Sequence, residues 1–313
     1  MTVLPDMEYG MGVNLIMGKK RYFIITIDTE GDNLWEWKEG SLISTENVKY
    51  LSRFQNLCDS YQFKPTWLAN WEMLNDDRFV DFAEKFLGKK QCEIGMHLHA
   101  WNTPPYYGLP KGEHAGLPYL IEYPEDVMKE KIITMTKTME EKFGRKPFTH
   151  RAGRWAVNDT YFKLLRELGY IADCSITPFV NWKTNAGQTP YFWGSDYSKE
   201  KTAVSIREGI IEVPVTTLWS EEKNRVLWLR PNRINLEEML YVIGQNRHSG
   251  NDYLMFMLHS SELMPGGSPT FKTQGGIEIL YEHLNIIFNE ISQTYVGVGL
   301  EEYVMLHNYF AGL

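Results

Sequence analysis

Residues 22–32 read YFIITIDTEGD, an unbroken apolar run that ends in three acids. The run 22–27 lacks the alternation of a strand with one wet face, so it suits a strand buried on both faces of a parallel sheet. Carboxylates at the end of such a strand, here Asp28, Glu30 and Asp32, are costly unless they are paired, hydrogen-bonded or bound to a cation. The alternative is an acidic turn in solvent.

Strand-like runs alternate with helical periodicity over nearly the whole chain. The expected strands are 22–27, 64–69, 93–99, 170–176, 210–215, 253–258 and 294–298, and the expected helices are 45–60, 77–87, 125–143, 158–168, 236–246 and 276–292. Roughly seven or eight such β/α units predict a mostly parallel sheet that is closed or nearly closed as a barrel. We therefore expect one α/β domain over residues 1–313, with its core at about 20–310.

The composition narrows the classes of partner. The net charge is −8 and no run of Lys and Arg stands out, which argues against a nucleic-acid binder. No segment approaches the roughly 18 uninterrupted apolar residues of a membrane span. The N-terminal residues do not resemble a signal peptide, and the three cysteines lie far apart without a CxxC pair. We therefore expect a cytoplasmic protein with free thiols, and the absence of heptads leaves its oligomeric state open.

A second stretch, EIGMHLHAW at residues 93–101, places two histidines one residue apart. In a strand, residues i and i+2 point to the same face, so His97 and His99 project together, about 7 Å apart at the backbone. Two such imidazoles can reach one metal ion through bonds of about 2.1 Å. The alternative is a pair of hydrogen-bonded or solvent-facing histidines.

Three further stretches place polar residues at or near the ends of expected strands. They are YLMFMLHSSE (253–262) with His259, THRAGRW (149–155) with Arg151 and Arg154, and YIADCSI (170–176) with Asp173. Each has a structural explanation of its own, such as a satisfied core histidine, a solvated arginine or an ion pair. Active sites of parallel α/β folds lie at the carboxyl ends of strands, so five polar insertions at corresponding places favour an enzyme.

With these motifs in this order, the sequence resembles the polysaccharide deacetylase family, carbohydrate esterase family four, over about residues 20 to 310. It looks most like the branch found beside lipopolysaccharide and O-antigen assembly genes, in which the strings IDTE, HLH, RAGRW and HSSELMPGGSP are typical. The resemblance implies a distorted (β/α)7–8 barrel. It also implies a metal-dependent hydrolase that removes an N-acetyl or other acyl group from a sugar of a cell-surface polysaccharide or its precursor.

The resemblance assigns catalytic roles by position. Asp28 matches the family's catalytic base, and Arg151 matches the arginine that orients this base. His259 matches the histidine that would donate a proton to the leaving amine. Asp173 is a weaker match to the acid that pairs with this histidine.

The resemblance also implies a divalent cation, with departures from the family's pattern. The usual second Asp falls on Thr29, so the metal-binding carboxylate is expected at Glu30, with Asp32 and Asp28 as alternatives. His97 matches the first histidine of the family's H-x-x-x-H motif. The second histidine position holds Trp101, so His99 is the expected substitute. Two imidazoles and one carboxylate favour Zn²⁺.

The saccharide would be held by aromatic side chains. Sugar rings could stack on Trp101 and Trp155, and on Tyr106 and Tyr107 of the irregular stretch 102–124, and Arg154 is a further candidate contact. Two other functions stay open. One is a small-molecule amidohydrolase on the same fold. The other is a catalytically inactive glycan-binding or assembly protein, which the departures at Thr29 and Trp101 would favour.

Overall fold

Strand β1 (Tyr22–Thr29) lies inside the main sheet and is bonded to other strands along both of its edges. The computed structural model describes residues 20–35, 41–106, 117–183, 194–232 and 235–307. The helices are α1 (Val48–Ser60), α2 (Trp71–Leu74), α3 (Asp77–Gly88), α4 (Glu125–Phe143), α5 (Asp159–Glu167), α6 (Leu236–His248), α7 (Gln274–Ser292) and α8 (Leu300–Leu306). The other strands are β2 (Thr66–Ala69), β3 (Glu93–Leu98), β4 (Thr149–Ala152), β5 (Ala172–Asp173), β6 (Ser205–Arg207), β7 (Ile210–Glu212), β8 (Thr217–Ser220), β9 (Arg225–Trp228), β10 (Tyr253–His259) and β11 (Val296–Val298).

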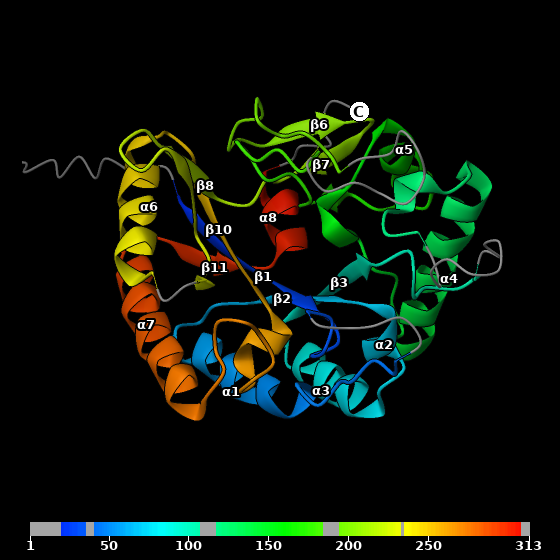
Figure 1. The fold of residues 1–313 in the computed structure, drawn as a ribbon, viewed down its shortest axis with the longest axis horizontal. Coiled ribbons are helices and arrows are strands. Elements are labelled where there is room, and N and C mark those ends of the chain that lie inside the picture. Colours follow the sequence, from blue (N-terminus) through cyan, green and yellow to red (C-terminus); the bar gives the residue numbers. More distant parts are fainter. Residues whose placement is uncertain (1–19, 36–40, 107–116, 184–193, 233–234, 308–313) are drawn as a thin grey trace, which may run out of the picture.

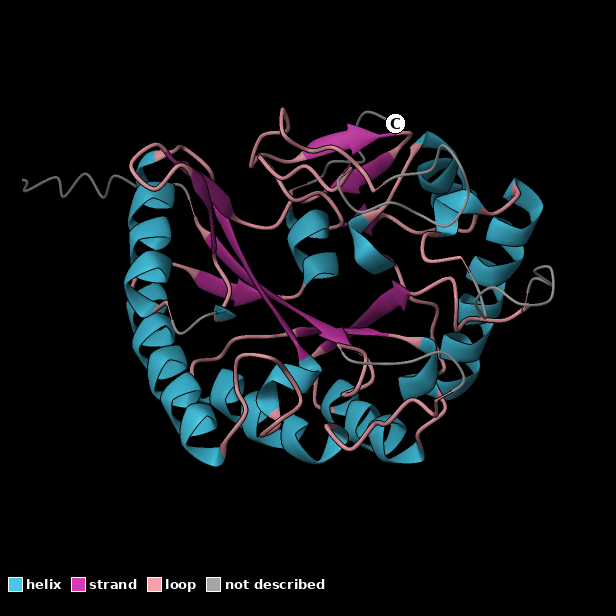
Figure 2. Cartoon of the chain, in the orientation of Figure 1, coloured by secondary structure: helices cyan, strands magenta, loops and turns pink. Residues whose placement is uncertain are grey.

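Nine of these strands form one sheet in the order β10-β1-β2-β3-β4-β5-β7-β6, and β11 pairs with β1. All neighbours run parallel except β6, which is antiparallel to β7. The strands curl into a ring, and α1, α3, α4, α6 and α7 cover its outside (Figures 1 and 2). This arrangement is the expected α/β architecture, a distorted barrel with helices around a mostly parallel sheet.

Irregular backbone almost completes the ring. Beyond β7, the chain turns toward β10, where the Thr216 amide donates to the Met255 carbonyl oxygen at 3.2 Å and the Met255 amide donates to Thr216 Oγ1 at 2.8 Å. The Met257 amide then donates to the carbonyl oxygen of Leu229 at 3.3 Å. The expected closed or nearly closed barrel is therefore confirmed, with a short seam in place of a regular ladder.

The two faces of β1 belong to different parts of the core. Phe23, Ile25 and Ile27 pack outward among the helices, whereas Ile24 belongs to a second apolar cluster inside the ring. That inner cluster also takes in Tyr303 of α8, the helix that lies inside the ring of strands in Figure 1. Both faces of the strand are thus buried, which is the reason that its sequence is apolar without alternation.

The expected elements are recovered with differences at their ends. The helix 125–143 is confirmed, and Gly144 follows it in the left-handed conformation with φ of 65°. The strand expected at 170–176 is reduced to β5, because side chains take the next amides: Ser175 N donates to Asp173 Oδ1 and Ile176 N to Glu212 Oε1. None of the helices in the described part of the chain is both long and apolar enough to cross a bilayer.

Candidate active site

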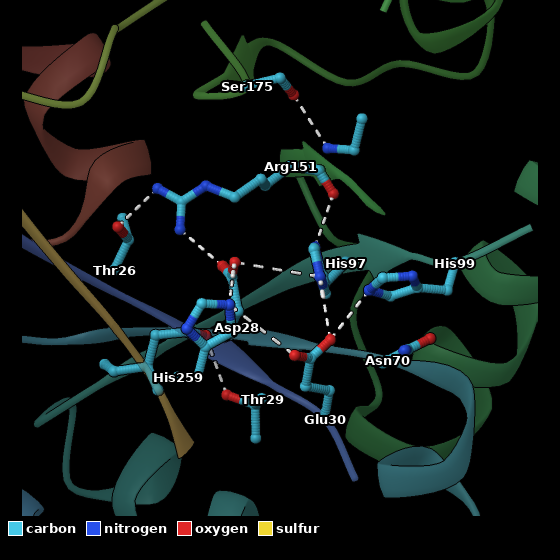
Figure 3. A network of polar contacts seen from close by, with 12 residues as sticks. Thr26, Asp28, Thr29, Glu30, Asn70, His97, His99, Arg151, Ser175 and His259 are labelled. Atoms are coloured by element: carbon cyan, nitrogen blue, oxygen red, sulfur yellow. Dashed lines mark hydrogen bonds and ion pairs between the residues drawn. The ribbon is translucent and has the colours of Figure 1, made fainter. Parts of the chain in front are cut away.

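The register of the parallel strands brings the polar residues of four strands to one end of the barrel. Asp28 on β1 lies directly opposite His259 on β10, and His97 on β3 lies opposite Arg151 on β4. Successive side chains of a strand point to opposite faces. Ile24 of β1 packs inside the ring, so Asp28, four residues later, points into the ring as well. Figure 3 shows these side chains turned toward one another.

Asp28 is buried and forms an ion pair with Arg151, whose Nη1 lies 2.6 Å from Asp28 Oδ1. The same guanidinium donates to Thr26 Oγ1 at 2.7 Å and to the carbonyl oxygen of Cys174 at 3.1 Å, so its direction is fixed. Burial alone would raise the pKa of Asp28, but the charges of Arg151 and His97 outweigh it and lower the pKa below its ordinary value. Asp28 is therefore held as a carboxylate.

Glu30 lies against two histidines: His97, which is on β3, and His99, which follows the end of that strand. Its Oε2 is 2.8 Å from Nε2 of His99 and 3.5 Å from Nε2 of His97. One ligand atom from each of the three residues lies within 4.8 Å of the others. Burial opposes ionisation of Glu30, but the hydrogen bonds to His97 and His99 hold its pKa well below the ordinary value.

The backbone of Glu30 is clamped from two sides. Its amide donates to Ser260 Oγ at 3.1 Å, and its carbonyl oxygen accepts from Asn47 Nδ2 at 2.8 Å and from Ser260 Oγ at 3.1 Å. Glu72 Oε1 accepts from the next amide, Gly31, and Glu72 Oε2 accepts from Asn102 Nδ2. The loops that follow β1 and β3 are thus joined to each other, which preorganises the carboxylate.

The two histidines are held by partners of opposite kind. Nδ1 of His97 lies 3.0 Å from the carbonyl oxygen of Arg151, an acceptor, so this nitrogen carries a proton. The carboxylates of Asp28 and Glu30 outweigh burial and raise the pKa of His97, so in the metal-free protein its Nε2 favours a proton as well. The indole N–H of Trp101 can only donate, and it faces Nδ1 of His99 at 3.2 Å. The assignment that satisfies both contacts therefore places the His99 proton on Nε2, where it is donated to Glu30.

The other two candidate carboxylates are engaged elsewhere. Asp32 Oδ2 accepts from Ser44 Oγ at 3.2 Å and from the Asn47 amide at 3.1 Å, so it fixes the loop that leads into α1. Asp28 gives one oxygen to Arg151, and its Oδ2 lies 4.0 Å from His97 Nε2 and 3.7 Å from His259 Nε2. Of the three acids, Glu30 is the one that lies against both His97 and His99.

His259 is paired with a carboxylate that the sequence did not indicate. Its amide donates to Glu262 Oε2 at 2.8 Å, and its Nδ1 lies 3.4 Å from the same oxygen. Arg230 Nη2 lies 3.2 Å from Glu262 Oε1 and 3.3 Å from His259 Nδ1. Burial opposes ionisation, but Arg230 and His259 lower the pKa of Glu262 to about 2.

The expected pairing of Asp173 with His259 is therefore wrong. Asp173 Oδ2 lies 2.5 Å from Nδ1 of His150 and accepts from Ser175 Oγ at 2.9 Å, and Nε2 of His150 faces the hydroxyl of Tyr161 at 2.8 Å. His150 precedes Arg151 on β4, so it points to the opposite face, toward α5. Asp173 thus belongs to a buried network outside the ring.

Of the expected substrate contacts, Trp101 and Trp155 adjoin the site. Trp101 binds His99, and the guanidinium carbon of Arg151 lies 4.9 Å from the centre of the Trp155 ring. Arg154 is exposed and lies over the ring of Tyr119 at 4.7 Å, while Tyr106 is 67% exposed. Tyr107 lies outside the described residues.

A strained turn follows Arg151 directly. Arg154 and Trp155 both have positive φ, 56° and 61°, which non-glycine residues rarely adopt. A Cβ at Gly153 would lie 2.9 Å from Cγ of His99 and 2.6 Å from the carbonyl oxygen of Leu98. The glycine therefore lets β4 approach the loop that carries His99.

Sequence reasoning missed Glu262 and Arg230. The string HSSE places Glu262 three residues after His259, a spacing at which a carboxylate can bond back to the preceding amide. Nothing in the sequence around Arg230 marks it, because it is 29 residues from His259 and reaches it through the fold.

Comparisons with known proteins support the fold. No family model matches the sequence, and no curated protein matches it. A putative polysaccharide deacetylase from Mycobacterium smegmatis has a TM-score of 0.56 at 13% identity, covering 92% of this chain and 91% of that one. A putative glycoside hydrolase/deacetylase from Parabacteroides distasonis has a TM-score of 0.61 at 8% identity, covering 93% of this chain and 72% of that one.

A third structure with this fold has a different activity in its name. It is the 4-alpha-glucanotransferase from Thermococcus litoralis, with a TM-score of 0.56 at 14% identity, covering 93% of this chain and 41% of that one. At these identities the likeness shows the fold alone, a distorted barrel of the deacetylase type. One fold can carry several activities, so the residues of the site decide the function.

Proposed function

We propose that this chain is a metal-dependent hydrolase that removes an acyl group, most simply N-acetyl, from the amine of a sugar. The observation that carries the proposal is the convergence, at the carboxyl end of one barrel, of a fixed carboxylate, a two-histidine and carboxylate cluster, and a histidine paired with Glu262. These are the groups needed to activate water and to protonate an amine.

Glu30, His97 and His99 would hold the cation. Their donor set of two imidazoles and one carboxylate suits Zn²⁺, and the Arg151 carbonyl oxygen on Nδ1 of His97 is the kind of outer contact that orients a ligating imidazole. For His97 and His99 to ligate through Nε2, the proton on that nitrogen has to leave each ring. A divalent cation bound there supplies Lewis acidity, polarising the amide carbonyl and lowering the pKa of water.

Asp28 acts as the general base. Arg151 binds one of its oxygens and keeps the group ionised, so Oδ2 is left facing the histidines, ready to accept the proton of an attacking water. Since Arg151 is itself fixed by Thr26, the direction of the free oxygen is set before substrate arrives.

His259 acts as the general acid on the other side of Asp28. An amine anion cannot leave unaided, so the nitrogen has to be protonated as the C–N bond breaks. Glu262 accepts from the His259 amide and lies beside Nδ1, so Nε2, 3.7 Å from Asp28 Oδ2, is the nitrogen that would give its proton to the amine.

The proposed substrate is a sugar of a cell-surface polysaccharide or its precursor. The deacetylase names of two solved structures with this fold support a saccharide, and the strings shared with the lipopolysaccharide and O-antigen branch support that pathway type. Trp101 and Trp155 are the proposed stacking surfaces at the site. Three buried free cysteines fit the proposed cytoplasmic location.

The test is acetate release from a panel of N-acetylated monosaccharides and nucleotide-linked sugars. The parent should release acetate, and Asp28→Asn should lose at least about 100-fold in rate while staying folded, because the amide cannot take the proton. Asp81→Asn, an exposed carboxylate on α3, is the matched control and should keep the parent rate. Equal rates for Asp28→Asn and the parent would remove the base. Ammonia release from small amides without acetate release would favour an amidohydrolase instead.

A further inference from the structure

A cleft beside His259 is not used by the proposed mechanism. It has a volume of about 520 Å³, and its walls come from two loops: Asp32, Asn33 and Trp35 after β1, and Met264, Pro269 and Lys272 before α7. This volume falls within the range of roughly 300–1,000 Å³ that is typical of small-molecule sites.

Trp35 separates this cleft from the catalytic groups. Its indole N–H donates to Ser261 Oγ at 3.1 Å, and its ring meets that of His259 edge-on, with centroids 5.0 Å apart. The side chain is nevertheless 45% exposed. A tryptophan whose polar N–H is satisfied while much of its ring stays open offers a flat apolar surface to a ligand.

Ser261 fixes both walls of the cleft relative to His259. Its Oγ holds Trp35, and its carbonyl oxygen accepts from the Met264 amide at 3.2 Å. A Cβ on Gly267 would lie 2.4 Å from that same carbonyl oxygen, so the second loop is packed directly against Ser261. Both walls of the cleft are therefore attached to Ser261, which follows the proposed general acid, His259, by two residues.

The chemistry of the cleft suits a hydroxylated ring. Trp35 supplies a face for the C–H groups of a pyranose, and the rim is polar, with the exposed Lys272 cation on one wall and the Asp32 and Asn33 side chains on the other. Asn33 is fixed by donating to the Leu42 carbonyl oxygen and accepting from the Ser44 amide. Stacking with hydrogen bonds at the rim is the general form of a carbohydrate site.

We infer that this cleft binds the sugar unit next to the one that reacts, with Trp35 as its stacking platform, so that the substrate is a glycan of at least two units. The inference rests on the proposed function, since it places the reacting sugar at His259. It makes Trp35 a residue that determines substrate length.

The test measures binding and turnover separately. The parent, Trp35→Ala, Trp35→Phe and the control Trp219→Ala, a 37% exposed tryptophan on β8, are titrated by calorimetry with N-acetylglucosamine and its β-1,4-linked dimer. The parent and Trp219→Ala should bind the dimer about tenfold more tightly than the monomer. Trp35→Ala should bind both alike, and Trp35→Phe, which keeps a flat ring, should retain most of the difference.

The outcomes separate the two proposals. Equal affinity of the parent for monomer and dimer, no binding of either, or an undiminished preference in Trp35→Ala would overturn the inference. Acetate release from the monomer is followed in the same samples. Its absence in the parent would count against the proposed hydrolase, whereas a length preference that depends on Trp35 would still establish the cleft as a saccharide site.

Discussion

His97 and His99 differ in their neighbours more than in their position. Both project from the inner face of β3 or its extension, as the i and i+2 spacing requires. A backbone carbonyl oxygen fixes one ring and an indole N–H fixes the other. The hydrogen-bond partners of each ring decide which nitrogen carries a proton, and the i and i+2 spacing does not predict these partners.

Glu262 should position His259. In Glu262→Gln the charge that holds Arg230 beside Nδ1 is lost, so the ring of the general acid should be less well oriented. We expect the kcat for acetate release to fall more than the KM changes. Asp173→Asn is the informative control, because this carboxylate binds His150 and its loss should leave kcat in place. A kcat that falls in Asp173→Asn and stays in Glu262→Gln would restore the pairing expected from the sequence.

Gly153 should matter for the cation through His99. An alanine there places its Cβ within 3 Å of the His99 ring and of a backbone oxygen, so one of them has to shift. We expect Gly153→Ala to weaken zinc binding about tenfold, because the loss of a contact that orients a metal-binding side chain typically lowers metal affinity by this much or more. Gly88→Ala, where nothing lies within 4 Å, should bind zinc like the parent in a competition titration with a chelating dye. Equal affinities for all three proteins would show that His99 is not needed in its present position.

The site could be predicted only in part from the sequence. Residues that lie on strands and carry a recognisable type, such as Asp28, His97 and Arg151, follow from period two and from the rule that sites lie at strand ends. The partners of these residues cannot be predicted in this way, because they depend on the face of the strand from which a neighbouring side chain projects. Asp173 was expected to pair with His259 from the resemblance of its motif, but its strand presents it to His150.

At the scale of elements, long amphipathic segments with clear caps were the most predictable. The α4 helix begins and ends where its periodicity and Gly144 indicate, and Asn158 caps α5 by accepting from the Tyr161 amide. Short strands were less predictable, because carboxylate side chains compete for the amides of the ladder after β5. The hairpin of β8 and β9 and the helix α8 were not expected.

Helix α8 is tied to the barrel by a buried acid. Glu93 at the start of β3 accepts from Thr149 Oγ1 at 2.7 Å and from the Glu301 amide at 2.9 Å. Burial raises the pKa of Glu93 from 4.5 to about 7. At this site the folded protein therefore binds more protons than the unfolded chain between these values, so the contribution of Glu93 to stability is greatest below pH 4.5 and falls as the pH rises to about 7.

Replacing Glu93 by glutamine should remove this slope. The neutral amide keeps an acceptor for Glu301 N and loses the cost of a buried charge, on the order of 3 kcal/mol at high pH. We expect the free energy of unfolding of Glu93→Gln, measured in urea from pH 4 to 8, to exceed that of the parent increasingly as the pH rises. The exposed control Glu84→Gln should follow the parent. Parallel curves for Glu93→Gln and the parent would show that Glu93 is not a buried charge.

At the scale of the whole molecule, the site draws on segments that are distant in sequence and central in the sheet. β1 pairs with β10, β2 and β11, so the strand that carries Asp28 is bonded to both the early and the late parts of the chain. This connectivity supports the expectation of one domain over the whole chain, which stays a prediction. A cation bound by Glu30, His97 and His99, as proposed, would therefore stabilise the fold as a whole.

Calorimetry should therefore show a single unfolding transition that zinc moves as a whole. A ligand that binds only the folded state at 100 times its Kd adds about 2.7 kcal/mol, which corresponds to a rise in Tm of roughly 5 °C for a chain of this size. His97→Ala should unfold in one transition without a zinc-dependent rise. Two transitions, of which zinc moves one, would divide the chain into two domains.

The most direct test of the central claim is the number of zinc ions bound per chain after dialysis against a weak chelator, measured by elemental analysis. We predict one ion in the parent, one in Asp28→Asn, which lacks the base but keeps the cluster, and none in His97→Ala. A parent that retains no ion, or a His97→Ala variant that retains a full equivalent, would contradict the account.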